Sequence, residues 1–292
     1  MRFFNKDERM KLASLETAID VISNELVNNS PYLPTLPDVA INIMNAVSKE
    51  ETSPKDLAAI ILTDPAISAR LIRVTNSPKF RGRTEISNVQ MAVLRLGNNT
   101  IRTLVSSMIT QQLFAPSSKF LENEFKQIWE LSRNVSAASH FLCSFAPHLD
   151  PNEAILAGLI HQVGKLPILM MIDQSPEFEE FKESPTLVGL LLEQAHGTAG
   201  KIVMDKLNFP ATIKPVASEY NNFRYDAGAK ADYVDVVQVA FLQSIAGTDH
   251  PACRVDCSIV PAFAKLGLSF DTETITLENI SDNIELVNSL FG

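Results

Sequence analysis

Apolar residues recur through most of the chain at intervals of three and four, the spacing that places them on one face of an α-helix. The clearest run follows a break at 97–99 (Gly-Asn-Asn) and consists of Ile101, Leu104, Val105, Met108, Ile109 and Leu113. Strand-like alternation is rare, and its best example, 233–239, alternates only in part and continues to Gly247. A segment of about 15 residues that ends at glycine favours helix over strand. We therefore expect an all-α protein.

Five Ser-Pro or Asp-Pro pairs stand where helical spacing begins: Ser53-Pro54, Asp64-Pro65, Asp150-Pro151, Ser175-Pro176 and Ser184-Pro185. The first residue of each pair can cap a helix, and proline is tolerated at the first helical position because its missing N–H would have no partner there. The pattern predicts helices near 10–28, 38–48, 54–63, 65–76, 88–96, 99–114, 118–146 and 151–172, then shorter helices to about 221 and a helical tail. The polar stretch 221–230 is the domain boundary that we favour.

The first predicted helix carries a seam of apolar residues with alternating intervals of three and four: Leu12, Leu15, Ile19, Ile22 and Leu26. This is the pattern that a coiled-coil partner would fill, but only about two heptads are present, fewer than a firm coiled-coil assignment needs. We favour packing of this helix on its own domain, with a homodimer as the open alternative.

The composition limits the classes of function. With 25 basic and 34 acidic residues the formal net charge is −9, which disfavours long-range attraction to nucleic acid or anionic membrane. No apolar run approaches the roughly 18 residues of a membrane-spanning helix, and the charged start of the chain leads into no apolar stretch, so we expect neither a membrane span nor a signal peptide. Three cysteines are too few for a disulfide framework and suit a reducing compartment. We expect a cytoplasmic protein.

Five basic residues fall within the fourteen positions 70–83 and no acidic residue interrupts them: Arg70, Arg73, Lys79, Arg81 and Arg83. Such a patch can hold a phosphate, a nucleotide or an acidic partner. The alternative, a solvated surface whose arginines pair with acids elsewhere, is the one we favour.

A second cluster superficially resembles a metal site and consists of His250, Cys253, Asp256 and Cys257. Its cysteines are separated by three residues, and no further cysteine or histidine follows them. Zinc sites usually join a C-x-x-C pair to a second pair of ligands. We therefore interpret the cluster as a loop with reduced thiols.

Three blocks of sequence resemble the opening of the HDOD domain, the HD-related output domain of bacterial signalling proteins. They are 33–40 (LPTLPDVA), 64–77 (DPAISARLIRVTNS) and 92–97 (AVLRLG). A fourth block, 157–166 (AGLIHQVGKL), resembles the GLLHDIGKL sequence that the family shares with HD-domain metal-dependent phosphohydrolases. The resemblance covers about residues 31–225.

The resemblance implies a multi-helix bundle of HD-domain-like architecture with an N-terminal helical subdomain. On this basis we divide the chain into an N-terminal helix (1–30), the N-terminal helical half of the HDOD domain (31–116), a degenerate HD-like helical half (117–225) and a C-terminal helical extension (226–292).

The same resemblance implies that most metal ligands of HD enzymes are missing here. Those enzymes use adjacent His and Asp residues, an earlier helical His, further His residues and a late Asp. In this chain the adjacent pair is His161-Gln162, and an approximate alignment sets Leu131, just after Trp129, at the earlier His. It also sets Glu219-Tyr220 near a later His pair and Phe241 near the final Asp.

A vestigial pocket of His161, Gln162, Lys165 and His196 is what we expect to be left of the site. Gln162 offers a neutral amide oxygen, which binds a hard cation weakly and supplies no charge. His161 is interpreted as a satisfied, half-buried residue and His196 as the mark of a helix junction. Lys165 is interpreted as a surface cation or a carboxylate partner that can meet a phosphate if the pocket is retained. We expect no catalytic residue, no metal and no cofactor.

Three functions are compatible with these features. The first is a non-catalytic regulatory module that binds a signalling protein or a small ligand. The second is a metal-dependent phosphohydrolase with a degenerate HD site. The third is nucleic-acid binding through the basic residues at 70–83, which the net charge disfavours.

Overall fold

The structure is a computed structural model that describes residues 6–28, 32–33, 38–47, 49, 51–80, 82–269, 283–288 and 290. These residues form helices and loops, with no strand among them, as the apolar spacing predicts. The α-helices are α1 (Lys6–Val27), α2 (Asp38–Val47), α3 (Pro54–Ile61), α4 (Pro65–Thr75), α5 (Val89–Thr110), α6 (Lys119–Leu142), α7 (Pro151–Ile160), α8 (Lys165–Gln174), α9 (Glu179–Lys182), α10 (Pro185–Lys206), α11 (Val216–Glu219), α12 (Tyr233–Ser244) and α13 (Pro261–Lys265).

Each of the five Ser-Pro or Asp-Pro pairs begins a helix. Ser53, Asp64 and Asp150 accept backbone N–H bonds in the first turns of α3, α4 and α7, as predicted for N-caps. Ser175 and Ser184 precede a 3₁₀ turn and α10 without a side-chain capping bond. The predicted helix at 233–244 is α12, and Asp232 and Asp235 close its N-terminus as a capping box.

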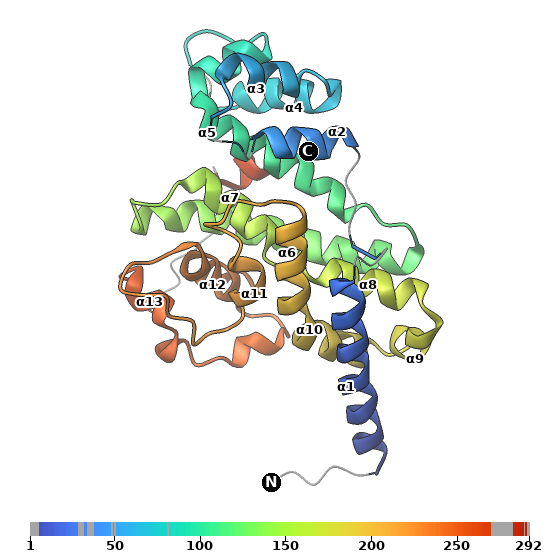
Figure 1. Cartoon of the computed structure of the whole chain (residues 1–292). Coiled ribbons are helices and arrows are strands. Elements are labelled where there is room, and N and C mark those ends of the chain that lie inside the picture. Colours follow the sequence, from blue (N-terminus) through green and yellow to red (C-terminus); the bar gives the residue numbers. More distant parts are fainter. Residues whose placement is uncertain are drawn as a thin grey trace.

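The N-terminal half consists of α2 to α5, and Figure 1 shows α3 and α4 at the end of the molecule, with α5 leading from there into the body. The break expected at 97–99 is present as Gly97, whose φ of 79° is non-helical and interrupts α5. Glycine adopts this left-handed backbone without steric cost. The second part of α5 then packs its buried face on α7.

The body is built around α6 and α7, whose backbones approach closely because Gly158 has no side chain. A Cβ at Gly158 would lie 2.6 Å from the Ser136 Cα. Helix α12 covers α6 and α7, and α10 lies against α8 and α11. Helix α1 packs on α10 and α8, with Leu15, Ile22 and Leu26 buried. The apolar seam of α1 therefore packs on its own chain, while Leu12 lies outside the described side chains.

The segment expected as one helix over 151–172 is two helices, α7 and α8, separated by turns at 161–164. The turns bring Gly164 against α10, where a Cβ would lie only 2.1 Å from the His196 carbonyl oxygen. The stretch Pro151–Gln174 is long enough to cross a membrane, and its most apolar part has a mean hydropathy of 1.7. An apolar run of this length was not expected from the sequence. Because 89 % of its most apolar part is buried inside the fold, it fits a core segment.

The polar stretch 221–230 connects α11 to α12 on the surface of the body. Helix α12 contributes buried residues to the same apolar core as α6 and α7, and Leu286, Val287 and Leu290 are also buried. The division of the chain at this stretch, like the four proposed segments, stays a prediction.

Candidate functional site

His161 lies at the start of the turns between α7 and α8 and is completely buried. Its Nδ1 is 2.6 Å from the Gly158 carbonyl oxygen, so Nδ1 carries the proton and donates. Its Nε2 has no hydrogen-bond partner among the described residues. The Tyr220 ring stands edge-on to the imidazole at 4.8 Å between centroids, and the Phe241 ring lies at 5.7 Å.

Five rings form a continuous cluster around this point, which we call the ring cluster: His161, His196, Tyr220, Phe241 and His250. Tyr220 is central, with its centroid 5.2 Å from those of both His196 and Phe241. Phe241 contacts His250 at 5.3 Å. Two of the residues that the alignment set at lost ligand positions, Tyr220 and Phe241, thus lie directly against His161.

Gln162 is 1 % exposed, and its Nε2 has no partner among the described residues. The Gln162 side chain faces the Tyr220 hydroxyl. Burial raises the pKa of Tyr220, and the contact with Gln162 lowers it in part. Leu131, set by alignment at the earlier His, is partly buried against the apolar core of α6. Its neighbour Trp129 packs on Phe114, with centroids 4.9 Å apart.

The imidazoles of the ring cluster are held neutral. Burial lowers the pKa of His161 to about 3, against a smaller rise from the Gly158 hydrogen bond. Burial, followed by the charge of Lys165, also lowers the pKa values of His196 and His250. Both nitrogens of His196 have partners: Nδ1 lies 2.9 and 3.0 Å from the Leu192 and Glu193 carbonyl oxygens, and Nε2 lies 3.1 Å from Asn221 Oδ1.

These side chains do not fit a divalent metal ion. Of the residues next to the inner position, His161 offers a free ring nitrogen, Gln162 is neutral, and His196 is occupied by its own hydrogen bonds. Within the described ranges no group of three or more His, Cys, Asp or Glu side chains is placed to hold a metal. Tyr220 and Phe241 further remove the space and the water that a catalytic ion requires.

A pocket of about 600 Å³ opens beside the ring cluster, on the other side of Tyr220 and Phe241, and we call it the open pocket. Helix α10 forms one wall with exposed residues that include Thr186, Gly189 and Glu193. Its remaining lining comes from α8, from 220–223, from α12 and from 250–255: Lys165, Tyr220, Asn221, Phe223, Phe241, His250, Pro251, Ala252 and Val255.

Lys165 is the residue of the vestigial pocket that faces this space. It is half-buried at the first position of α8, and its ammonium forms no ion pair or hydrogen bond with any residue that the structure describes. Burial lowers the pKa of Lys165 to about 8, and the charges of Glu193 and Glu124 oppose that shift. The interpretation of Lys165 as a surface cation or a carboxylate partner that can meet a phosphate stays a prediction.

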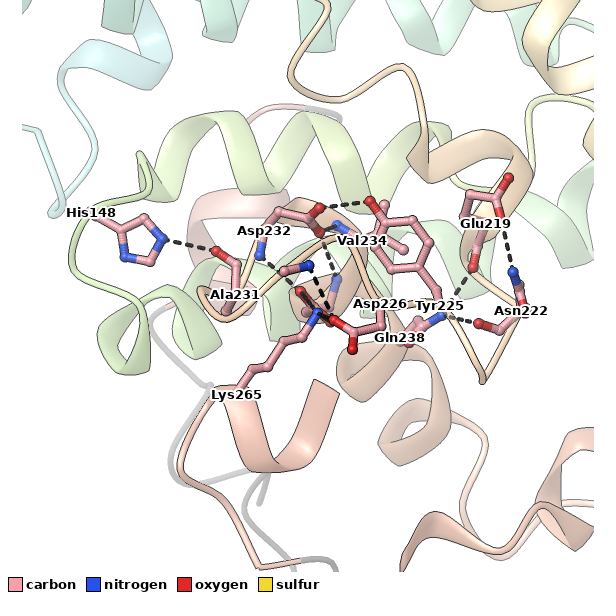
Figure 2. Close-up of polar contacts among 12 residues, drawn as sticks. His148, Glu219, Asn222, Tyr225, Asp226, Ala231, Asp232, Val234, Gln238 and Lys265 are labelled. Atoms are coloured by element: carbon pink, nitrogen blue, oxygen red, sulfur yellow. Dashed lines mark hydrogen bonds and ion pairs between the residues drawn. The ribbon is translucent and has the colours of Figure 1, made fainter. Parts of the chain in front are cut away.

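A polar network anchors the wall of the open pocket to α12 and α13 (Figure 2). The buried Gln238 amide donates to the Glu219 carbonyl at 3.0 Å and to the Asn222 carbonyl at 2.7 Å, on either side of Tyr220 and Asn221. These bonds fix the backbone that presents both side chains to the pocket.

Further along the same stretch, Tyr225 donates its hydroxyl proton to Asp232 at 2.7 Å. Lys265 of α13 pairs with Asp226 at 3.0 Å and with the buried Asp235 at 3.2 Å. The segment interpreted from sequence as a polar linker is thus tied at several points to the body.

The described residues of the basic stretch 70–83 do not line the open pocket. Arg70 is half-buried and donates to the Gln111 side chain at 2.6 Å, while Arg73, Lys79 and Arg83 are exposed. Arg81 lies outside the described residues. Whether the exposed residues bind a partner stays a prediction.

The second cluster divides in the structure. His250 faces the open pocket and accepts the Ala252 N–H on Nδ1 at 3.1 Å. Cys253 donates to the Ile245 carbonyl, and Asp256 caps the turn that follows. Neither Cys253 nor Cys257 is in a disulfide, and the interpretation of the cluster as a loop with reduced thiols stays a prediction.

Among the residues that the sequence did not assign to a pocket are Glu193, Asn221, Phe223 and His250. The spacing of Thr186, Gly189, Glu193 and His196 places them on one face of a helix, so Glu193 was within reach of a periodicity argument. Asn221 and Phe223 lie in the supposed linker, and their position depends on the Gln238 contacts, which leave no local signal.

The sequence profile of the HDOD domain matches residues 33–223 of the 292-residue chain. An uncharacterized protein of Treponema pallidum (strain Nichols) is 19 % identical over 210 residues, which cover 68 % of this chain and 39 % of that protein. The chain therefore spans well under half the length of this relative.

Three solved structures share the fold. A candidate metal-dependent phosphohydrolase from Shewanella amazonensis SB2B has a TM-score of 0.77 at 24 % identity, with 96 % of this chain and all of that chain covered. An HDOD domain protein of unknown function from Geobacter sulfurreducens has a TM-score of 0.64 at 18 % identity, with 94 % and 97 % covered. A candidate signal transduction protein from Marinobacter aquaeolei VT8 has a TM-score of 0.60 at 16 % identity, with 96 % and 64 % covered. Because the HDOD profile spans most of the chain, the protein belongs to the HDOD domain family.

Proposed function

We propose that this chain is a non-catalytic regulatory module that acts by binding a signalling protein or a small ligand. The observation that carries the proposal is the packing of Tyr220 and Phe241 against His161, at 4.8 and 5.7 Å between ring centroids. Family resemblance sets these two residues at lost ligand positions. Rings in those places supply neither a metal ligand nor room for a bound water.

The chemistry of hydrolysis explains why this packing matters. A divalent ion generates the nucleophile by lowering the pKa of a bound water, and the protein must leave a coordination position open for it. Here His161 contributes one neutral nitrogen and Gln162 contributes no charge. Membership of the HDOD family and a fold shared with a candidate signal transduction protein support a regulatory role.

One observation favours the alternative, a metal-dependent phosphohydrolase with a degenerate site. His161 donates Nδ1–H to the Gly158 carbonyl and leaves Nε2 free, which is the arrangement of a metal-ligating histidine. A single oriented imidazole is too small a donor set for a catalytic metal, so this remnant does not displace the binding function.

The test compares the wild-type protein with Gln162→Asp. Metal content is measured by plasma spectrometry, and hydrolysis is assayed on a generic phosphodiester, a nucleotide panel and a cyclic dinucleotide with manganese, magnesium or iron added. We expect no stoichiometric metal and no turnover in either protein, because one added carboxylate beside His161 leaves Tyr220 and Phe241 in place. Stoichiometric iron or manganese in the wild type, with turnover lost in His161→Ala, would establish the enzyme instead.

A further inference from the structure

The open pocket combines an apolar floor with a cation that has no ion-pair or hydrogen-bond partner among the described residues. A larger hollow of about 780 Å³ lies against α2 and α3, but its lining, which includes Asn42, Asn45, Lys49, Glu51 and Asp56, is mostly exposed and lacks such a floor. In the open pocket Tyr220 and Phe241 are 2 % and 1 % exposed. A ligand seated there would lose water on both its apolar and its charged parts.

Lys165 occupies a position that costs stability. Its ammonium is partly removed from water, it has no carboxylate partner among the described residues, and it stands at the N-terminus of α8, where the helix dipole disfavours a cation. Lysines are rarely kept in such places unless something else compensates for the cost. An anionic group of a ligand would do so.

His250 adds a hydrogen-bond donor to the same space. Its Nδ1 accepts the Ala252 N–H at 3.1 Å, so in the neutral ring the proton is on Nε2. His250 lines the pocket, and burial, followed by the charge of Lys165, lowers its pKa. Together they form a cationic and a neutral donor for one acidic group.

The opposite surface is aromatic. Tyr220, Phe223 and Phe241 line the pocket, joined by Leu192 and Val255. Flat rings gain from stacked or edge-on contacts with such a surface, in addition to the burial of apolar area.

We propose that the open pocket binds a small planar aromatic molecule that carries one acidic group, with the acidic group at Lys165 and His250 and the ring against Tyr220, Phe223 and Phe241. This inference rests on the proposed function, since it identifies the chemistry of the small ligand. Glu193, exposed on the α10 wall, limits the ligand to a single charged group because it would repel a second.

The probe is 8-anilinonaphthalene-1-sulfonate, an aromatic monoanion whose fluorescence reports transfer to an apolar site. We expect one probe per folded chain and a loss of affinity of about tenfold or more in Lys165→Met, the cost of removing a charged hydrogen-bond donor. Lys206→Met, an exposed lysine of α10 outside the pocket, is the matched control and should bind normally.

A second variant keeps the result interpretable if Lys165→Met changes the fold. His250→Asn retains an oxygen that can accept the Ala252 N–H but removes the Nε2–H donor, so affinity should fall several-fold while thermal stability is kept. AMP and indole-3-acetate then compete with the probe, and whichever displaces it shows whether the acidic group is a phosphate or a carboxylate. Inorganic phosphate and naphthalene, each holding half of the chemistry, should compete poorly.

Affinity should also depend on pH through Lys165. The groups that face it are Glu193 on α10, Glu124 on α6 and the three imidazoles of His161, His196 and His250. Binding should be strongest at the low end of the neutral range, weaken as pH rises through about 8 because the ammonium loses its proton, and lose this dependence in Lys165→Met.

Equal probe affinity in the wild type, Lys165→Met and His250→Asn would overturn the inference, as would binding of several probes per chain that neither competitor displaces. This failure is distinct from failure of the proposed function, which is decided by metal content and turnover. A metal-free, inactive protein whose pocket binds no aromatic acid would still be a regulatory module, with another ligand or a protein partner.

Discussion

The two sides of Tyr220 and Phe241 differ in how far their polar side chains are exposed to solvent. On the inner side His161 and Gln162 are at most 1 % exposed, and each keeps a polar atom without a described partner. On the outer side Lys165, Asn221 and His250 are half-buried around a space of about 600 Å³. The rings of Tyr220 and Phe241 therefore cover His161 on the inner side and border the open pocket on the outer side.

The largest expected effect tests how much the buried Phe241 ring, which lies between the two sides, contributes to the free energy of unfolding. Phe241→Ala should destabilise the protein by about 3–5 kcal/mol, since it leaves a cavity among His161, Tyr220 and His250. Phe223→Ala, the same change on the half-exposed outer wall, should cost about 1 kcal/mol. Denaturant unfolding measures both, and equal losses would show that the two sides are packed alike.

The glycines of the two sides give the next comparison. Gly164→Ala should cost about 1–3 kcal/mol or more, because the new Cβ would lie 2.1 Å from the His196 carbonyl oxygen and backbone must shift. Gly189→Ala on the pocket wall meets no atom within 4 Å and should stabilise α10 by about 0.5–1 kcal/mol. If Gly164→Ala leaves the free energy of unfolding unchanged, the 161–164 turns and α10 can move apart to accept the methyl group.

The contrast between the two sides also marks how far the sequence could predict the structure. The all-α fold, the helix starts at Ser53, Asp64 and Asp150 and the break at Gly97 follow from local chemistry, because capping and backbone freedom act within a few residues. The turns at 161–164 were missed, since apolar residues flank them on both sides and the break depends on contact with α10.

The candidate site was accessible only in part for the same reason. Family resemblance singled out Tyr220 and Phe241, which lie far apart in sequence and meet at His161. Asn221 and Phe223 were interpreted as linker because their polar surroundings resemble a loop. Their place in the pocket depends on Gln238, whose two hydrogen bonds reach back 16 and 19 residues.

Lys165 allows a direct measurement of the free energy that a partly buried cation costs the fold on the outer side. Its pKa in the folded protein, about 8, is lower than its ordinary value of 10.5, so the charged form destabilises the fold below pH 8 and this penalty disappears as pH rises through 10.5. Lys165→Met should therefore be more stable than the wild type by about 1–2 kcal/mol at pH 7. Its advantage should shrink between pH 8 and 10.5, as followed by urea midpoints at each pH. A variant that is less stable at pH 7 would show that Lys165 is held by compensating contacts.

The smallest expected effect separates the open pocket from the basic stretch. Arg83 is exposed, so Arg83→Glu should change the free energy of unfolding by less than about 0.5 kcal/mol and leave aromatic-anion binding at Lys165 unaltered. Arg70→Glu is the internal contrast: burial lowers the pKa of Arg70 and its guanidinium donates to Gln111 at 2.6 Å, so reversal of its charge should cost more, about 1–2 kcal/mol.

Arg83→Glu then reports on a macromolecular partner alone. If a partner recovered from native lysate is lost in Arg83→Glu while the probe still binds, the protein has two separate binding surfaces. If Arg83→Glu destabilises the fold as much as Arg70→Glu, the arginines of this stretch are structural and a partner site there is excluded.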